Sequence, residues 1–326
     1  MPEHSPELSG RPAPDSVFAG SGDLGTEISA IAHGDAYNLE AGHTLDPDQV
    51  EGAVAKKRLG VAFWIALSIF VIICLAALLA PVLPLKSYTA TLGRPKQAPS
   101  AQFWFGTDAL GRDIFSRVIW GGRVSLVVGF ASIFFGLVIG GTIGLAAGYL
   151  RGRTETILMG AMDVLLSFPA LLLALAIVSF STSRTLVIIS VAIGVVSIAP
   201  IARMVRANTL TYADREFVVA ARSLGAGNLR IIRREILPNV IPPVASYAII
   251  LIAVAIVGEG VLAFLGLSVA PPTPTWGGMA YDGKPSIETA PWISLIPSAA
   301  IFIVALCLNL AGDRLREFFD IRDGSL

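Results

Sequence analysis

The 326-residue sequence has few of the side chains on which most enzymes depend. Its three histidines are His4, His33 and His43, all near the N-terminus, and its two cysteines, Cys74 and Cys307, stand alone in apolar runs. It has no Cys-x-x-Cys pair and no Gly-x-x-x-x-Gly-Lys-Ser/Thr loop. These gaps argue against a histidine catalyst, a metal centre and a phosphate-binding loop. We expect a non-enzymatic chain that binds no metal and no cofactor.

Charged residues are also scarce, at 15% of the chain, whereas 54% of residues are hydrophobic and the mean hydropathy is +0.71. A charge at the centre of a bilayer costs about 2.5 to 3.5 kcal/mol, so uncharged runs of about 20 residues mark membrane crossings. The sequence therefore predicts an all-α membrane protein with six transmembrane helices. The runs lie between residues 58 and 86, 123 and 151, 163 and 184, 184 and 203, 235 and 259, and 288 and 313.

Lysine and arginine are unevenly divided between the two sides that six spans define. If the N-terminus is inside, the inside segments hold Lys56, Lys57, Arg58, Arg151, Arg153, Arg203, Arg206, Arg215, Arg222, Arg230, Arg233, Arg234, Arg314, Arg316 and Arg322. The outside segments then hold Lys86, Arg94, Lys96, Arg112, Arg117, Arg123, Arg184 and Lys284. This bias favours a multi-pass protein of a prokaryotic cell (inner) membrane with both termini cytoplasmic, although the first outside loop is unusually basic.

The N-terminal residues 1–56 differ in kind from the rest. Their first fifty or so residues carry ten acidic residues against a single Arg11, and they contain no apolar run long enough to form a core. We expect a disordered acidic cytoplasmic tail, either a docking tail for a soluble partner or, more commonly, a solvated extension. At the other end, residues 314–326 are expected to form a short cytoplasmic tail.

A polar and basic segment separates two long apolar runs after residue 213. Asp214 is expected to cap a helix whose first turn holds Glu216, where a carboxylate favours the helix dipole. Gly225 is expected to end this helix in the left-handed conformation. An apolar stripe with i, i+1, i+4 and i+7 spacing is expected along one side, formed by Phe217, Val218, Ala221 and Leu224.

A second short helix is expected to start at a cap formed by Asn228 and to end near Pro238. Between the two helices lies a turn, so the segment predicts helix, turn and helix on the cytoplasmic face. Ala220 and Ala221 leave the first helix shallow on one side, which lets the groove of another protein approach its backbone.

This segment resembles the EAA loop of ABC importer permeases, whose pattern is Glu-Ala-Ala, three residues, Gly, nine residues and Ile-x-Leu-Pro. Five residues match it in register: Ala220, Ala221, Gly225, Leu237 and Pro238. Val219 replaces the family's Glu and Glu235 its Ile, with Glu216 and Ile236 displaced nearby. The resemblance implies that an ATPase subunit couples to Glu216, Phe217, Ala220, Ala221, Arg222, Leu224, Gly225, Leu237 and Pro238.

Two further motifs narrow the resemblance to the dipeptide, oligopeptide and nickel permeases. Phe264-Leu-Gly-Leu267 with Pro271-Pro-Thr-Pro-Thr-Trp-Gly277 is similar to their sequence before the last span. Phe105-Gly-Thr-Asp-Ala-Leu-Gly-Arg-Asp113, with Ser116-Arg117 and Arg123-Val-Ser125, is similar to the first outside loop of the C-type subunit. The resemblance covers residues 57–322 and implies a type I ABC importer permease fold with a cytoplasmic coupling-helix (EAA) loop.

The resemblance also implies a domain plan and partners. The permease core, with five transmembrane helices, is expected at 123–313, after a first transmembrane helix and an extracytoplasmic loop with an amphipathic helix at 57–122. The implied partners are a second, B-type permease, two ATP-binding subunits that hold ATP and Mg, and an extracytoplasmic substrate-binding protein. The chain would then form half of a translocation pore for short peptides (di- and oligopeptides), or for nickel or another small solute.

The first outside loop contains two pairs of opposite charge at i, i+4 spacing, Asp108 with Arg112 and Asp113 with Arg117, which predict a short helix. Its other side is apolar, so we expect it to lie along the outer membrane interface. It would serve either as a docking ledge for the binding protein or as an interfacial anchor.

Glycine and proline break the apolar segment 262–285, which is therefore expected to form a re-entrant or surface loop beside the outer mouth. Within it, Trp276 contacts substrate or, as we favour, anchors at the interface. Glu259 at the end of a span faces the cavity or is hydrated. Glycines at every fourth position are expected to pack closely on another helix; they are Gly136, Gly140, Gly144 and Gly148. Ser167-Phe-Pro169 predicts a kink.

Two other classes of function fit less well. A self-contained secondary transporter or channel needs ionisable residues inside its spans, and the predicted spans have none. A DNA reader built on the basic helix-turn-helix would be tethered too closely between two spans to reach a duplex, so we expect the bilayer and protein partners but no nucleic acid.

Overall fold

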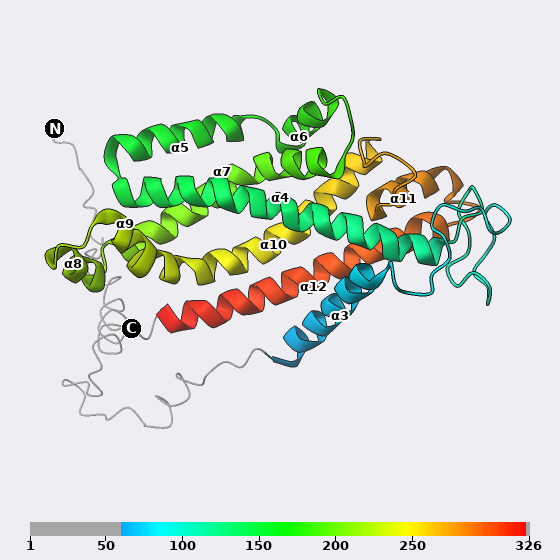
Figure 1. Ribbon diagram of the computed structural model, residues 1–326, viewed down its shortest axis with the longest axis horizontal. Coiled ribbons are helices and arrows are strands. Elements are labelled where there is room, and N and C mark those ends of the chain that lie inside the picture. Colours follow the sequence, from blue (N-terminus) through cyan, green and yellow to red (C-terminus); the bar gives the residue numbers. More distant parts are fainter. Residues whose placement is uncertain (1–59, 324–326) are drawn as a thin grey trace, which may run out of the picture. The chain divides into compact units, whose positions relative to one another are not determined.

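The computed structural model of the protein describes residues 60–323, and it describes side chains as far as residue 319 (Figure 1). The predicted acidic tail at 1–56 lies outside these residues. Within the described part every regular element is helical, and the only pairing of strand type is an isolated bridge between Thr107 and Asp113. The all-α prediction is confirmed.

Five helices are long and apolar enough to cross a membrane. They are α3 (Gly60–Leu79), α4 (Ile114–Leu150), α7 (Leu186–Ala213), the continuous helix Asn228–Phe264 that contains α10 (Leu237–Phe264), and α12 (Trp292–Asp323). A sixth crossing is present if the bent pair α5 (Gly152–Ser167) and α6 (Ala170–Ser179) counts as one span. The chain is a multi-pass membrane protein.

Helices α5 and α6 meet at an angle of 82° at Phe168 and Pro169, so the predicted kink is confirmed and is sharper than a bend within one helix. Proline lacks an N–H and disfavours the helical conformation in the residue before it, and Phe168 is extended accordingly. The predicted bounds of this span, 163 to 184, are wrong. Helix α5 already begins at Gly152 and includes Asp163, whose carboxylate accepts a hydrogen bond from Arg203 of α7 at 2.6 Å.

The glycines of α4 pack on α7, as predicted. A Cβ atom built at Gly140 would lie 2.5 Å from the carbonyl oxygen of Ile198, and one built at Gly144 would lie 2.5 Å from that of Ala202. Only glycine allows the two backbones to come this close. Because the α4 glycines recur every fourth residue, this contact continues along α4.

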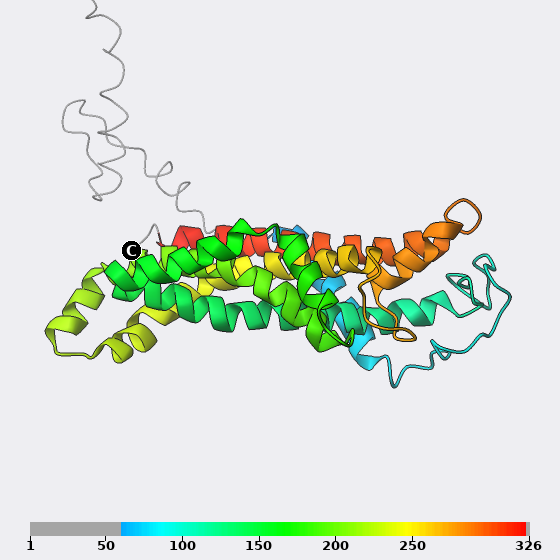
Figure 2. The same cartoon turned by 90° about the horizontal axis from the view of Figure 1, so that it is seen from above.

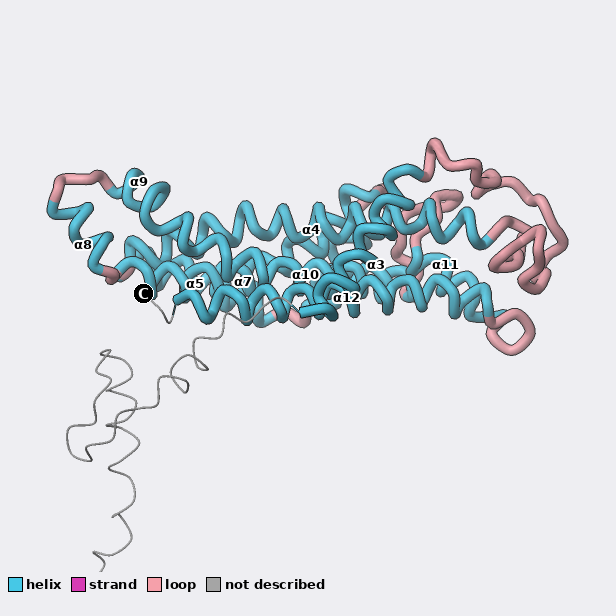
Figure 3. Tube along the Cα trace, turned by 90° about the horizontal axis from the view of Figure 1, so that it is seen from below, coloured by secondary structure: helices cyan, strands magenta, loops and turns pink. Residues whose placement is uncertain are grey.

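The described part has two ends that are far apart along the spanning helices (Figures 2 and 3). At one end, which we call the α8 end, lie α8 (Glu216–Ser223) and α9 (Asn228–Ile231). At the other, the α11 end, lie α11 (Trp276–Gly283), the 3₁₀ turn Lys284–Ser286 and the long connection between α3 and α4.

Two predicted short helices do not exist as separate elements. The helix that starts at Asn228 continues through a π-helical turn, Ile232–Ile236, into α10. Pro238, which has no backbone N–H to donate, lies directly after this turn. The amphipathic helix expected in the first outside loop is the beginning of α4. Residues 108–113 before it form turns and a bridge.

We predict that Gly144→Ala lowers the stability of the purified protein by about 1 to 3 kcal/mol, because the added methyl group forces α4 away from Ala202. The matched control is Gly141→Ala on the same helix, where no atom lies within 4 Å of an added Cβ. Alanine favours the helix at that position, so stability should stay constant or rise slightly. Thermal unfolding in detergent measures both, and equal effects would contradict the packing account.

Candidate functional site

The segment between α7 and α10 forms the α8 end. Helix α7 ends at Ala213, and α8 starts at Glu216 with Arg215 in the capping position. The prediction that Asp214 caps α8 is wrong, because its carboxylate instead accepts a hydrogen bond from Arg151 at 2.7 Å. Glu216 does lie in the first turn of α8, as predicted. Two residues thus separate a spanning helix from α8.

Helix α8 buries a narrower stripe than predicted. Val218 is fully buried and Ala221 packs beside it, against a cluster that includes Val205 of α7 and Ile236. The other two members of the predicted stripe face outward, since Phe217 is 40% exposed and Leu224 is 88% exposed. Because Val219 and Ala220 are also exposed, α8 presents an uncovered surface of apolar and small side chains, which we call the α8 face: Phe217, Val219, Ala220 and Leu224.

Gly225 ends α8 with a φ angle of +81°, which confirms the predicted left-handed turn. The next N–H, that of Ala226, donates to the carbonyl oxygen of Ala221 at 3.1 Å and closes the helix end. Glycine is needed at this position because of the left-handed backbone conformation. A side chain would meet no neighbour, since no other atom lies within 4 Å of the Cβ position.

Tyr149, in the last turn of α4, contacts both sides of this segment. Its hydroxyl donates to the side-chain oxygen of Asn228 at 3.0 Å, and the Arg222 guanidinium carbon lies 5.9 Å from its ring centroid. The prediction that Asn228 caps the second helix is wrong, because Asn228 is the first residue of α9 and Gly227 holds the capping position. No local sequence pattern indicates this role of Tyr149, because it is 79 positions from Asn228.

At the α11 end, Asp108 lies between two guanidinium groups. Its carboxylate is 2.6 Å from Arg112 and 3.6 Å from Arg117, and all three side chains are mostly buried. The predicted pair of Asp113 with Arg117 is wrong. Asp113 caps α4 by accepting hydrogen bonds from the N–H and hydroxyl of Ser116, while Arg117 donates to the carbonyl oxygen of Tyr88.

These charges border a cavity of about 860 Å³ between the 108–117 region and the loop at 266–275. Asp282 lines it as well, and burial raises the pKa of this carboxyl group while the charges of Arg117 and Arg112 act in the opposite direction. Arg184 closes another side and donates to the carbonyl oxygen of Gly266. The structure thus adds two residues, Asp282 and Arg184, that sequence reasoning did not place at this site.

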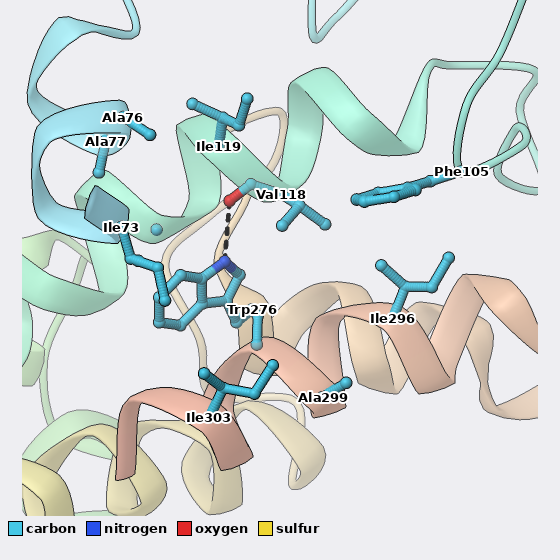
Figure 4. Close-up of a pocket in the computed structure, with 12 residues that line it drawn as sticks. Ile73, Ala76, Ala77, Phe105, Val118, Ile119, Trp276, Ile296, Ala299 and Ile303 are labelled. Atoms are coloured by element: carbon cyan, nitrogen blue, oxygen red, sulfur yellow. Dashed lines mark hydrogen bonds between the residues drawn. The ribbon is translucent and has the colours of Figure 1, made fainter. Parts of the chain in front are cut away.

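Trp276, predicted to be an interfacial anchor, is only 2% exposed. Its backbone N–H donates to the Ser125 hydroxyl at 3.1 Å, and its indole N–H donates to the carbonyl oxygen of Val118 at 2.8 Å (Figure 4). The ring rests on Gly122, where a Cβ would lie 2.7 Å from it, and forms a wall of an apolar pocket of about 370 Å³. Trp276 therefore joins α11 to α4 instead of facing the membrane interface.

Glu259 is fully buried inside the continuous helix Asn228–Phe264, so the prediction of a hydrated carboxylate is wrong. Its oxygens accept hydrogen bonds from Ser125 of α4 at 3.2 Å and from Ser268 of the loop at 3.1 Å. The expectation that no span contains an ionisable residue fails here as well. The carboxylate of α10 thus connects α4 with the loop before α11. Ser268 extends this network through a hydrogen bond of 2.9 Å with Thr275.

A metal site finds no support among residues 60–323, where no group of three or more His, Cys, Asp or Glu residues could hold an ion. What the described residues combine is a set of spanning helices, an exposed helix between two of them at one end, and a polar cavity at the other. This is the architecture of a transport permease.

The chain belongs to the family of binding-protein-dependent transport system inner membrane components, which matches residues 140–322. It is 38% identical to the dipeptide transport system permease protein DppC of Alkalihalophilus pseudofirmus over 81% of this chain and 86% of that one. It is 40% identical to the glutathione transport system permease protein GsiD of Pectobacterium atrosepticum, over 70% and 75% of the two chains. A putative peptide transport system permease protein of Brucella suis is 40% identical over 80% and 88%.

Solved structures show the same fold. A chain of the MetNI methionine ABC transporter in an inward-facing conformation aligns with a TM-score of 0.52 at 21% identity, covering 63% of this chain and 97% of that one. A chain of an amino acid ABC transporter crystallised with histidines aligns with a TM-score of 0.50 at 17% identity, covering 63% and 94%. The fold is that of a type I ABC importer permease.

We predict that Ser125→Ala destabilises the protein by about 1 to 3 kcal/mol, because it removes hydrogen-bond partners of both Glu259 and the Trp276 N–H. The control is Ser190→Ala, which changes another buried serine on a spanning helix. Within the described residues the Ser190 hydroxyl has no hydrogen-bond partner, so its loss should be neutral or slightly stabilising. Thermal unfolding of the two variants decides the matter, and a neutral Ser125→Ala would refute the network.

Proposed function

We propose that this permease forms half of the translocation pore of an ATP-driven importer for short peptides. The other half is a second, B-type permease. Two ATP-binding subunits, which hold ATP and Mg, attach at the α8 end, and an extracytoplasmic binding protein delivers the solute at the α11 end. The chain itself catalyses no covalent chemistry, and its work consists of changes between inward-open and outward-open states.

The α8 face is the observation that carries this proposal. A short helix with exposed apolar and small side chains connects two spanning helices, and such an uncovered surface favours a protein partner. Because only two residues separate α8 from α7, a displacement of α8 is transmitted directly to α7. The proposed coupling residues are Glu216, Phe217, Ala220, Ala221, Arg222, Leu224, Gly225, Leu237 and Pro238.

Short peptides are proposed as the solute from the names of the relatives, which are permeases for dipeptides, glutathione and, in the Brucella suis protein, peptides. The same importer type for nickel or another small solute is the alternative. A cavity with acidic and basic side chains suits a zwitterionic solute, since Arg112 and Arg117 can attract a carboxylate and Asp282 an ammonium group.

The α8 end is proposed to be cytoplasmic, with both termini on that side. Support comes from arginines at this end that have no carboxylate within 4 Å among the described residues, namely Arg215, Arg222, Arg230, Arg233 and Arg234. At the α11 end, in contrast, Arg112 and Arg117 share the carboxylate of Asp108. This group of arginines beside α8 follows the positive-inside rule.

On the extracytoplasmic side we assign separate roles to the predicted residues. Asp108, Arg112 and Arg117 border the cavity that receives the solute. Asp113 positions them by capping α4. Trp276 and Glu259 do not line this cavity and are proposed to hold the cavity wall in place through Ser125.

Leu224→Asp tests the coupling role. Leu224 is 88% exposed, so the change should leave insertion and thermal stability unaltered within about 0.5 kcal/mol. A buried charge in the interface should instead weaken the attachment of the ATP-binding subunits by about tenfold or more. Co-purification of those subunits and ATP-dependent uptake of a labelled dipeptide are the readouts.

The matched control is Val82→Asp, which places the same charge on another residue with high exposure, 76%, in the connection at the α11 end. It should leave the ATP-binding subunits attached. Full attachment and uptake in Leu224→Asp would remove α8 from the coupling interface.

A further inference from the structure

An apolar groove of about 600 Å³ lies between α3 and α4. It shares Ala77 with the separate pocket drawn in Figure 4. Cys74 and Leu78 line it from α3, and Val127, Phe130 and Phe134 line it from α4. The three α4 side chains are 44%, 44% and 69% exposed. The groove is thus an open, apolar furrow on the surface of two spanning helices, whose surroundings are lipid.

Arg123 lines the same groove at its end nearest α11. Together with Val127, Phe130 and Phe134 it forms a stripe with i, i+4, i+7 and i+11 spacing, which lies on one face of α4. At 1.5 Å per residue the stripe is about 16 Å long, close to the roughly 15 Å hydrocarbon thickness of one leaflet. The groove is therefore about as long as the hydrocarbon region of one leaflet is thick, and Arg123 lies at its end nearest α11.

The depth of Arg123 fits the boundary between hydrocarbon and headgroups. Helix α3, with 20 residues, is about 30 Å long and just spans the hydrocarbon. Its last turn contributes Ala77 and Leu78 to the groove that Arg123 also lines, so Arg123 is level with the end of α3. Phosphate groups of the bilayer lie at this level.

The charge of Arg123 lacks a protein counter-ion. Among the side chains of residues 60–319 no carboxylate lies within 4 Å of its exposed guanidinium, whose carbon atom is 5.9 Å from the centre of the Trp120 ring. Three other arginines at this end have partners, since Arg112 and Arg117 share Asp108 and Arg184 binds a carbonyl oxygen. A guanidinium matches a phosphate with paired hydrogen bonds.

We propose that this groove is a binding site for one bilayer phospholipid. Arg123 holds the phosphate, and one acyl chain runs along the stripe of α4 between that helix and α3, towards the middle of the membrane. The lipid fills a furrow that side chains leave open and fastens the peripheral α3 to the bundle. The site depends on neither the solute nor the ATP-binding subunits.

Photolabelling tests the proposal. The full-length chain, purified with the subunits that accompany it, is placed in nanodiscs of phosphatidylethanolamine and phosphatidylglycerol that contain a phosphatidylglycerol with a diazirine in its acyl chain. After illumination, labelled peptides are mapped by mass spectrometry. We expect adducts at residues 74–78 and 126–134, and a roughly tenfold loss of these adducts in Arg123→Gln, which removes a charge-assisted contact.

Two variants serve as comparisons. Arg153→Gln removes another exposed arginine, at the α8 end, and should leave groove labelling unchanged. Ala131→Phe fills the groove that Ala131 lines and should abolish groove labelling even with Arg123 present. Thermal unfolding identifies any variant that has lost its fold.

Three results would overturn the proposal. The first is full groove labelling in Arg123→Gln, and the second is an equal loss in Arg153→Gln, which would indicate a general effect of charge. The third is a wild-type groove that takes up no lipid label and instead cross-links to another polypeptide, which would make it a protein interface.

Discussion

Helices α4 and α7 lie so close together that their backbones touch, and the rest of the described structure is arranged around this pair. Gly140 and Gly144 leave no room for a methyl group against the carbonyl oxygens of α7. In lipid the hydrophobic effect does not drive helices together, so close van der Waals packing of this kind is a main source of their association. The two long helices therefore form one closely packed unit.

Each end of the molecule is attached to that pair. Helix α8 continues from α7, and Tyr149 of α4 contacts both Arg222 and Asn228. At the other end Ser125 of α4 hydrogen-bonds Glu259 and the Trp276 N–H. A continuous series of packed elements therefore joins α8 to the wall of the cavity at the α11 end, as the proposed coupling through α8 requires.

Local sequence patterns predicted the parts of this structure that local physics determines. Uncharged runs located the spans except the bent pair α5 and α6, whose bounds of 163 to 184 were wrong. The spacing of Gly136 to Gly148 located a helix contact, and Gly225 and Pro169 located a turn and a break. The burial of Trp276 and Glu259 was beyond such patterns, because Ser125 is 151 and 134 positions away from them. The outward direction of Phe217 and Leu224 depends on which side of α8 meets the bundle, and an apolar stripe alone does not decide that.

Cross-linking in the membrane tests whether α8 contacts an ATP-binding subunit and whether that contact changes with ATP. The chain with Leu224→Cys, in its assembled complex, is treated with a short bifunctional reagent that joins a cysteine to a lysine, without nucleotide and with ATP. The native cysteines lie inside spans, at 74 and 307, away from an aqueous reagent. The account predicts an adduct between position 224 and an ATP-binding subunit whose yield changes with ATP. The control is a cysteine introduced at the α11 end, which should form adducts with the proteins next to that end. If this control reacts and position 224 forms no adduct with an ATP-binding subunit, coupling through α8 is contradicted.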